Sequence, residues 1–304
     1  MPTNLLLWVS FNVFIFLLLI LDLTVLRKKV HTVKIKEALL WSAFWIGLAL
    51  LFNLGVFFFA GRDKALQFFT GYLLEESLSV DNLFVFIQIF NYFSVPSHYQ
   101  HRVLFWGIIG VVITRASFIL GGVALMGTFH WIIYLFGAFL VFTGIKLGLS
   151  DEAEISHDKN PVIRFLRKFF KVSETFENGK FFVKKDSGTY ITSLFIVLVT
   201  IEITDIIFAF DSIPAVLAVT SDSFIAYSSN LFAVLGLRSL YFALSGMMGL
   251  FHYLKYGLAT ILVFIGLKML LSNIIEFSTL ISLGFIVLVL SISVGASLLH
   301  KKTT

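Results

Sequence analysis

FHWIIYLFGAFLVFTGIK, residues 129–146, returns as FHYLKYGLATILVFIGLK at residues 251–268, an offset of 122 residues. The opening Phe-His pair, the Val-Phe pair, the second glycine and the final lysine keep their places. Upstream, Arg115 matches Arg238 at an offset of 123, and Glu75 with Asp81 and Asn82 matches Asp205 with Asp211 and Ser212 at an offset of 130. The chain therefore contains an internal repeat, with small changes of length in the loops.

The composition identifies the surroundings in which this repeat folds. Of the 304 residues, 58% are hydrophobic and 13% are charged, and the mean hydropathy is +0.94. These values lie outside the range of soluble domains and predict an all-α, polytopic membrane protein. The basic residues gather between apolar runs, so the net charge of +5 is a topology signal and does not indicate binding to nucleic acid.

The apolar runs predict nine transmembrane helices, each long enough to cross a bilayer. They are expected at residues 4–26, 38–60, 66–95, 102–125, 129–149, 190–219, 223–248, 252–272 and 275–299. The first run leads directly into Arg27, Lys28 and Lys29, so it is expected to be a retained membrane anchor and not a cleaved signal peptide.

These spans suggest a division of one membrane domain, residues 1–304, into five parts. The parts are two N-terminal spans (1–65), repeat one (66–149), a basic loop (150–189), repeat two (190–272), and the last span with its tail (273–304). Each repeat has three spans, and because three is odd the two copies must cross the membrane in opposite senses. Such inverted repeats are typical of secondary transporters, whose sites lie near the midplane.

Lysine and arginine collect in the first loop, in the loop 150–189 and after the last span. This bias predicts an N-terminus outside and a C-terminus in the cytoplasm. Within the long loop, residues 162–171 alternate apolar and basic residues at helical spacing, which fits either an amphipathic helix on the inner membrane surface or an ordinary basic loop.

Six carboxylates interrupt the apolar runs, and they are where the function is expected. They are Glu75, Glu76 and Asp81 in repeat one and Glu202, Asp205 and Asp211 in repeat two. A carboxylate at bilayer depth costs about 3 kcal/mol, so these six indicate a bound cation, protons or a polar cavity. On regular helices Glu75, Ser79 and Asn82 would share one face, and Glu202, Asp205 and Ser212 would share another.

Asp81 and Asp211 would point elsewhere on unbroken helices. Pro214 removes a hydrogen bond to the carbonyl of Phe210, so unwinding near Asp211 is expected to turn its carboxylate toward the other acids. Arg115 and Arg238 are each expected to pair with a nearby carboxylate. The remaining excess of oxygen donors, with no cysteine in the chain, favours a hard divalent cation such as magnesium, calcium or manganese.

Two motifs carry a resemblance to a known family. Glu75-x-x-Leu78-Ser79-x-Asp81-Asn82-x-x-Val85 and Glu202-x-x-Asp205-x-x-Phe208-x-x-Asp211-Ser212-Ile213-Pro214-Ala215 resemble the signature stretches of the TerC/Alx family of bacterial integral membrane proteins. The resemblance covers about residues 66–275. It implies manganese(II) export across the cytoplasmic (inner) membrane, links to tellurium resistance and an older proposal of redox modulation.

The resemblance also implies which residues meet the metal, whereas the residues alone indicate only a hard-cation or proton-coupled transporter. The implied set is Glu75, Asp81, Asn82, Glu202, Asp205, Asp211 and Ser212, with Glu76 and Ser79 as additional candidates. No enzymatic activity and no resident cofactor are expected. The absence of cysteine and of an obvious haem or flavin motif counts against direct redox chemistry. The metal ion is the cargo, and protons are the expected counter-ion.

Two other functions stay open at this point. The chain would be an accessory for membrane-protein insertion, or for metal loading of exported enzymes, if a protein partner bound the loop 150–189. An exporter of anions or organic solutes would need excess positive charge or a larger cavity, and the excess of acids argues against anions.

Overall fold

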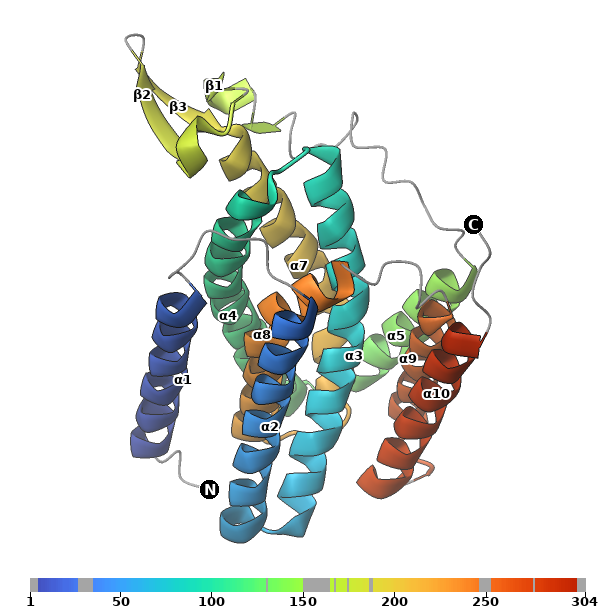
Figure 1. Ribbon diagram of the computed structural model, residues 1–304. Coiled ribbons are helices and arrows are strands. Elements are labelled where there is room, and N and C mark those ends of the chain that lie inside the picture. Colours follow the sequence, from blue (N-terminus) through green and yellow to red (C-terminus); the bar gives the residue numbers. More distant parts are fainter. Residues whose placement is uncertain are drawn as a thin grey trace.

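The computed structural model describes residues 5–26, 35–129, 131–149, 165–166, 168–173, 175–185, 188–245, 253–275 and 277–299. Nine long helices run through these residues, one at each of the nine places where an apolar run predicts a span (Figure 1). They are α1 (Leu5–Leu26), α2 (Ile35–Ala60), α3 (Arg62–Tyr92), α4 (Ser97–Thr128), α5 (Ile132–Leu149), α7 (Ser193–Leu217), α8 (Ser223–Ser245), α9 (Leu254–Leu270) and α10 (Thr279–Leu299). The prediction of an all-α membrane protein is confirmed.

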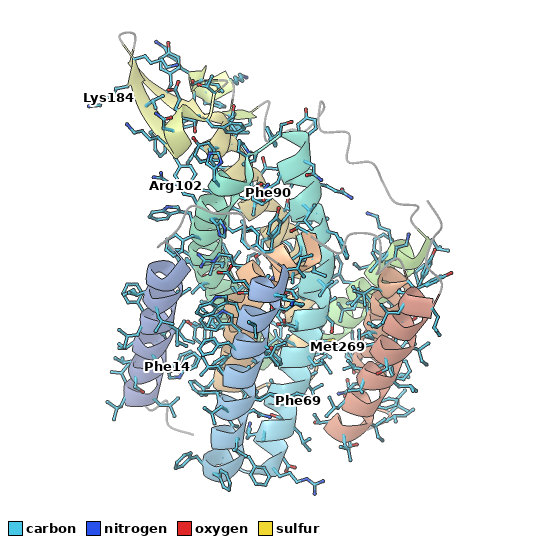
Figure 2. The ribbon with its side chains drawn as sticks, in the orientation of Figure 1. Phe14, Phe69, Phe90, Arg102, Lys184 and Met269 are labelled. Carbon is cyan, nitrogen blue, oxygen red and sulfur yellow. The ribbon has the colours of Figure 1, made fainter. Side chains whose placement is uncertain are left out.

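Five of these helices, α2, α4, α5, α7 and α10, are long and apolar enough by themselves to cross a membrane. The apolar part of α1 is shorter, α9 has 17 residues, and α3 carries the acids of repeat one. Apolar side chains also cover the outer helices, as a lipid-facing surface requires. Phe14 on α1 is 38% exposed, whereas Phe90 on α3 is 1% exposed among its neighbours (Figure 2).

The centre of the bundle is formed by α3, α4, α7 and α8, with α2 packed against α3 and α8. Almost every side chain of α8 from residue 225 to residue 239 is buried. Gly61 joins α2 to α3 with a φ of 91°, a conformation that glycine adopts without strain. From this turn α3 rises through the bundle, and α7 enters from the opposite end, so these equivalent helices of the two repeats run in opposite directions (Figure 1).

The equivalent helices α5 and α9 pack closely, with glycines at their contact. A Cβ atom at Gly137 would lie 2.9 Å from the carbonyl oxygen of Gly266, and one at Gly144 would lie 2.8 Å from that of Ala259. In the repeat, Gly137 is equivalent to Ala259 and Gly144 is equivalent to Gly266, at the offset of 122 residues. The contact of Gly137 with Gly266 is therefore equivalent to the contact of Gly144 with Ala259. The helices are therefore antiparallel and related by a local two-fold axis, as inverted repeats would be. Small residues allow this approach.

Residues 172–192 form a three-stranded sheet that the sequence analysis did not predict. Its strands are β1 (Val172–Ser173), β2 (Phe182–Lys185) and β3 (Gly188–Thr192), in the order β1-β3-β2, with β1 parallel and β2 antiparallel to β3. Lys185 pairs with Glu177 at 2.8 Å, and the hydrogen bonds from Lys185, Ser173 and Thr175 lower the pKa of Glu177 to about 2. This sheet leads directly into α7.

The predicted amphipathic helix at residues 162–171 is only partly visible. Residues 165–166 and 168–169 are helical, residues 170 and 171 are not, and residues 162–164 and 167 lie outside the described residues. Residues 27–34 and 300–304, which carry much of the basic charge used to assign the orientation, also lie outside the described residues. The orientation therefore stays a prediction.

The close packing of α5 and α9 predicts different effects for two Gly→Ala substitutions. Gly266→Ala would place a Cβ atom 2.6 Å from the carbonyl oxygen of Gly137, so it should lower the free energy of unfolding by about 1–3 kcal/mol. Gly284→Ala, on α10, meets no atom within 4 Å and should be neutral or slightly stabilising. Thermal unfolding of the purified protein in detergent measures both, and equal midpoints would contradict the packing.

Candidate functional site

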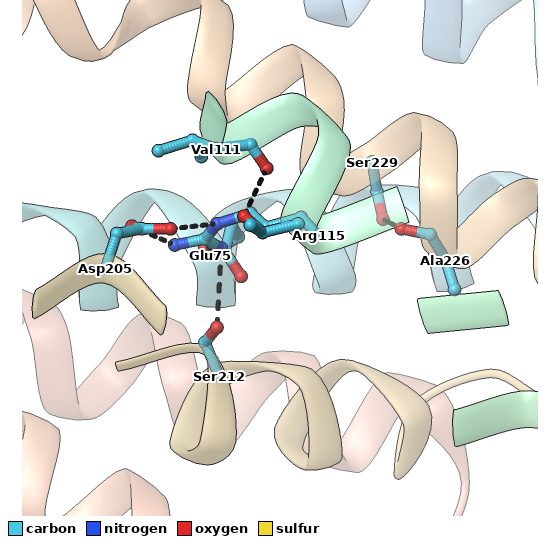
Figure 3. A network of polar contacts seen from close by, with 8 residues as sticks. Glu75, Val111, Arg115, Asp205, Ser212, Ala226 and Ser229 are labelled. Carbon is cyan, nitrogen blue, oxygen red and sulfur yellow. Dashed lines mark hydrogen bonds and ion pairs between the residues drawn. The ribbon is translucent and has the colours of Figure 1, made fainter. Parts of the chain in front are cut away.

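A buried arginine on α4 links both repeats. Arg115 donates from Nη2 to Oδ1 of Asp205 at 3.0 Å and from Nε to Oδ2 at 3.4 Å, so its guanidinium faces both oxygens of one carboxylate. Its Nη1 donates to Oγ of Ser212 at 3.3 Å and forms an ion pair with Glu75 (Figure 3). The side chains of Arg115 and Glu75 are 0% exposed, and that of Asp205 is 1% exposed.

These contacts join three helices, of which two belong to repeat one and one belongs to repeat two. Glu75 on α3 and Arg115 on α4 belong to repeat one, whereas Asp205 and Ser212 belong to α7 of repeat two. Asp205 and Ser212 are seven residues apart, which is two turns of a regular helix, so both side chains reach the same guanidinium. When all groups are ionised, two carboxylates and one guanidinium leave the site with one net negative charge.

Glu202 lies one turn before Asp205 and fills space that two glycines of α4 leave free. Its Oε1 atom would be 3.7 Å from a Cβ atom at Gly107, and a Cβ atom at Gly110 would overlap the carboxylate. Within the described part of the chain, this buried Oε1 has no hydrogen-bond partner. A second acid of α7 therefore lies against α4, with an oxygen available to a ligand.

Asp211 does not join Arg115, and the predicted unwinding of α7 is wrong. The helix is continuous from Ser193 to Leu217 with Pro214 inside it. All residues from 212 to 217 are buried, and the amide of Ala218 still donates to the Pro214 carbonyl at 2.9 Å, so packing holds the helix despite one missing hydrogen bond. Asp211 instead faces α5, where Thr143 hydrogen-bonds to it and Lys146 is the nearby cation.

The other predicted residues on α3 divide between two sides of the helix. Ser79 and Asn82 are buried, like Glu75, and no hydrogen-bond partner for Oγ of Ser79 occurs among the described residues. Glu76 accepts a hydrogen bond from Tyr72 and lies near Gly236 of α8. The side chain of Asp81 lies outside the described residues. On α8, Arg238 is buried.

Asn230 on α8 is a buried polar residue that was not predicted from the sequence. Its side chain is 0% exposed, and neither atom of its amide has a hydrogen-bond partner in the part of the chain that the structure describes. Leaving such an amide unpaired costs about 1–3 kcal/mol, so a water molecule or an ion is expected beside it. Its signal in the sequence is a single amide that follows Ser228 and Ser229 inside a predicted membrane span.

The acids whose side chains the structure describes do not form a ready metal-binding group. Among the side chains that the structure describes, which exclude Asp81, no three Asp, Glu or His residues gather closely enough to hold a metal ion. Glu75 and Asp205 do converge, but the guanidinium of Arg115 lies between them. The predicted set of seven ligands stays a prediction.

A second ion pair lies at the end of the bundle where α7 leads into α8. Lys64 contacts Asp222 at 2.8 Å, and both side chains are partly exposed, at 33% and 27%. Burial by itself raises the pKa of Asp222, but the hydrogen bond from Lys64 and the backbone amides of Ile225 and Phe224 bring the pKa below its usual value. This pair offers a matched control for the buried site.

Comparison with known proteins shows that one protein family matches most of this chain. The model of the integral membrane protein TerC family matches residues 60–304. The chain is similar to a membrane protein of Myxococcus xanthus, STKORF319, with 46% identity over 97% of this chain and 93% of that relative. It is similar to the "Putative membrane-bound redox modulator Alx" of Salmonella typhi, with 46% identity over 95% of this chain and 92% of the relative.

The protein of the same name in Escherichia coli (strain K12) is 45% identical over 96% of this chain and 94% of its own length. No solved structure matches this chain.

Removing Asp205 should be far more costly than removing Asp222. Asp205→Ala leaves the buried guanidinium of Arg115 with Glu75 as its only carboxylate partner, and breaking a buried pair costs about 3–5 kcal/mol. Asp222→Ala breaks a partly exposed pair and removes the cap that accepts from the amides of Phe224 and Ile225, so it should cost about 1–2 kcal/mol. Urea or thermal unfolding in detergent compares the two variants, and a similar cost for both would mean that the Arg115 network does not hold the repeats together.

Proposed function

Because the chain belongs to the TerC family of integral membrane proteins, we propose that it is a secondary transporter that exports divalent metal cations, above all manganese(II), across the cytoplasmic membrane. The observation that supports this proposal is the meeting of Glu75, from one repeat, with Asp205 and Ser212, from the other, at a buried site. Inverted-repeat transporters bind their cargo at such a junction of the repeats.

The charge of the site favours a cation as cargo. A net negative charge deep in an apolar bundle is unfavourable, and a divalent cation or a proton relieves it. The atoms offered are carboxylate and hydroxyl oxygens, which are ligands for manganese, magnesium and calcium, and the chain has no thiolate for softer metals. The choice of manganese among these ions rests on the family resemblance.

Movement of one repeat against the other would open the site alternately to the two sides of the membrane. Arg115 on α4 and Asp205 on α7 belong to opposite repeats, so this movement changes their contact directly. Glu202, which lies against Gly107 and Gly110 with one unpaired oxygen, would be a further ligand along the same helix. Protons that neutralise the carboxylates after release of the metal would serve as the counter-ion.

An accessory role through a protein partner is the second candidate. β2 forms one edge of the sheet in residues 172–192, and Phe182 on this strand is 54% exposed. An open sheet edge can pair with a strand of another protein. The redox role in the name of the Alx relatives would have to act without a thiol here, because the chain has no cysteine.

A deletion distinguishes these two functions. Replacing residues 181–189 by a short flexible linker removes the edge strand and leaves Thr192, whose side chain accepts a hydrogen bond from the first turn of α7. A transporter should keep its metal flux after this change. Loss of partner association with intact flux would favour an accessory role of this sheet edge, and intact partner association would remove the sheet edge from that role.

Accumulation of radioactive manganese in inverted membrane vesicles tests export. The wild-type protein should accumulate manganese above vesicles that lack it, and Asp205→Asn should reduce accumulation to that background because the site loses one of its two central carboxylates. Asp222→Asn, at the partly exposed pair, should accumulate manganese like the wild type.

Competition by magnesium and calcium ranks the cations, and an imposed pH gradient tests the counter-ion. The proposal would be abandoned if the correctly inserted wild-type protein gave no accumulation above background.

A further inference from the structure

We infer that Arg115 is a resident counter-cation: its guanidinium occupies the central site between transport events and competes with the transported metal for the same oxygen atoms. This inference rests on the proposed function and deepens it. It concerns how the site changes its charge during the cycle, a point that neither the family nor the repeat determines.

The contacts of Arg115 use the atoms that a hard cation would use. The guanidinium faces both oxygens of Asp205, at 3.0 and 3.4 Å, and reaches Oγ of Ser212 at 3.3 Å. It also forms the ion pair with Glu75. A metal ion that bound these two carboxylates would therefore need the space and the lone pairs that the guanidinium now holds.

Charge opposes simultaneous occupation of the site that Glu75 and Asp205 form. With Arg115 in place, the two carboxylates carry one net negative charge, which is too little to balance a divalent cation. With Arg115 withdrawn, the carboxylates of Glu75 and Asp205 balance a divalent cation completely. Because the side chains are 0–1% exposed, solvent does little to screen the repulsion between a metal ion and the guanidinium.

The helices provide a way to withdraw the guanidinium. Glu75 and Arg115 move with repeat one, whereas Asp205 and Ser212 move with α7 of repeat two. A shift between the repeats breaks the contacts with Asp205 and Ser212, and the incoming metal ion then displaces the guanidinium from Glu75 as well. The guanidinium then returns when the metal has left, so the empty site is never left with two uncompensated carboxylates.

A purely structural role for Arg115 makes a different prediction. If Arg115 only offsets the cost of burying Asp205, its removal should destabilise the site and weaken metal binding. If Arg115 competes with the metal, its removal should strengthen binding and slow release. The sign of the change in metal affinity therefore separates the two roles.

The experiment measures manganese binding to the purified full chain by the electron paramagnetic resonance signal of free manganese(II). Arg115→Gln should lower the Kd for manganese at least tenfold. In inverted vesicles the same variant should show a lower KM together with a lower maximal rate, since release becomes slow. Arg115→Lys keeps the charge but loses the two-pronged contact with Asp205, so its Kd should lie between those of the wild type and Arg115→Gln.

Lys64→Gln is the matched control, because it removes a positive charge from the partly exposed pair with Asp222, and its Kd should equal that of the wild type. If Arg115→Gln does not survive purification, the Kd of Arg115→Lys decides alone. A Kd equal to or higher than that of the wild type, in folded Arg115 variants of a protein that transports manganese, overturns the inference and leaves the proposed function intact. Absence of manganese binding in the wild type and in all variants overturns both.

Discussion

The contact between Arg115 and Asp205 is the constraint on which the two halves of this protein depend. It joins α4 of repeat one to α7 of repeat two in surroundings that exclude water, with both side chains at most 1% exposed. Buried ion pairs add little stability compared with well-packed apolar side chains of the same volume, but losing one partner is costly. Apolar residues would hold α4 against α7 equally well, so a pair of charges at this place indicates a function that needs charge.

The packing of α5 against α9 explains why this site contains one acid from each repeat. The reciprocal contacts Gly137 with Gly266 and Gly144 with Ala259 define a local two-fold axis. Residues related by such an axis can approach each other only close to it. Glu75 and Asp205 are equivalent by the offset of 130 residues, and both contact one guanidinium. The site therefore lies near the axis, where both repeats contribute to it.

The sequence predicted the helices well because long apolar runs leave little choice in a membrane, where every backbone group must be bonded within its helix. The spacing of Asp205 and Ser212 also predicted their shared face. The sequence could not show that Pro214 would leave α7 straight, since that depends on how tightly residues 212–217 are packed. Nor could it show that glycines of α4 make room for Glu202, or that a basic loop folds into short strands, because these features depend on neighbours distant in the chain.

α7 connects the central site to the pair formed by α5 and α9. One side of this helix presents Asp205 and Ser212 to Arg115 on α4, and another presents Asp211 to Thr143 and Lys146 on α5. Both α4 and α5 belong to repeat one, so α7 is held by repeat one at two polar places. A movement of the repeats is expected to change both places together, because a buried carboxylate left without a partner is costly. If the proposed transport function holds, the transported ion and protons would compensate these carboxylates while the repeats move.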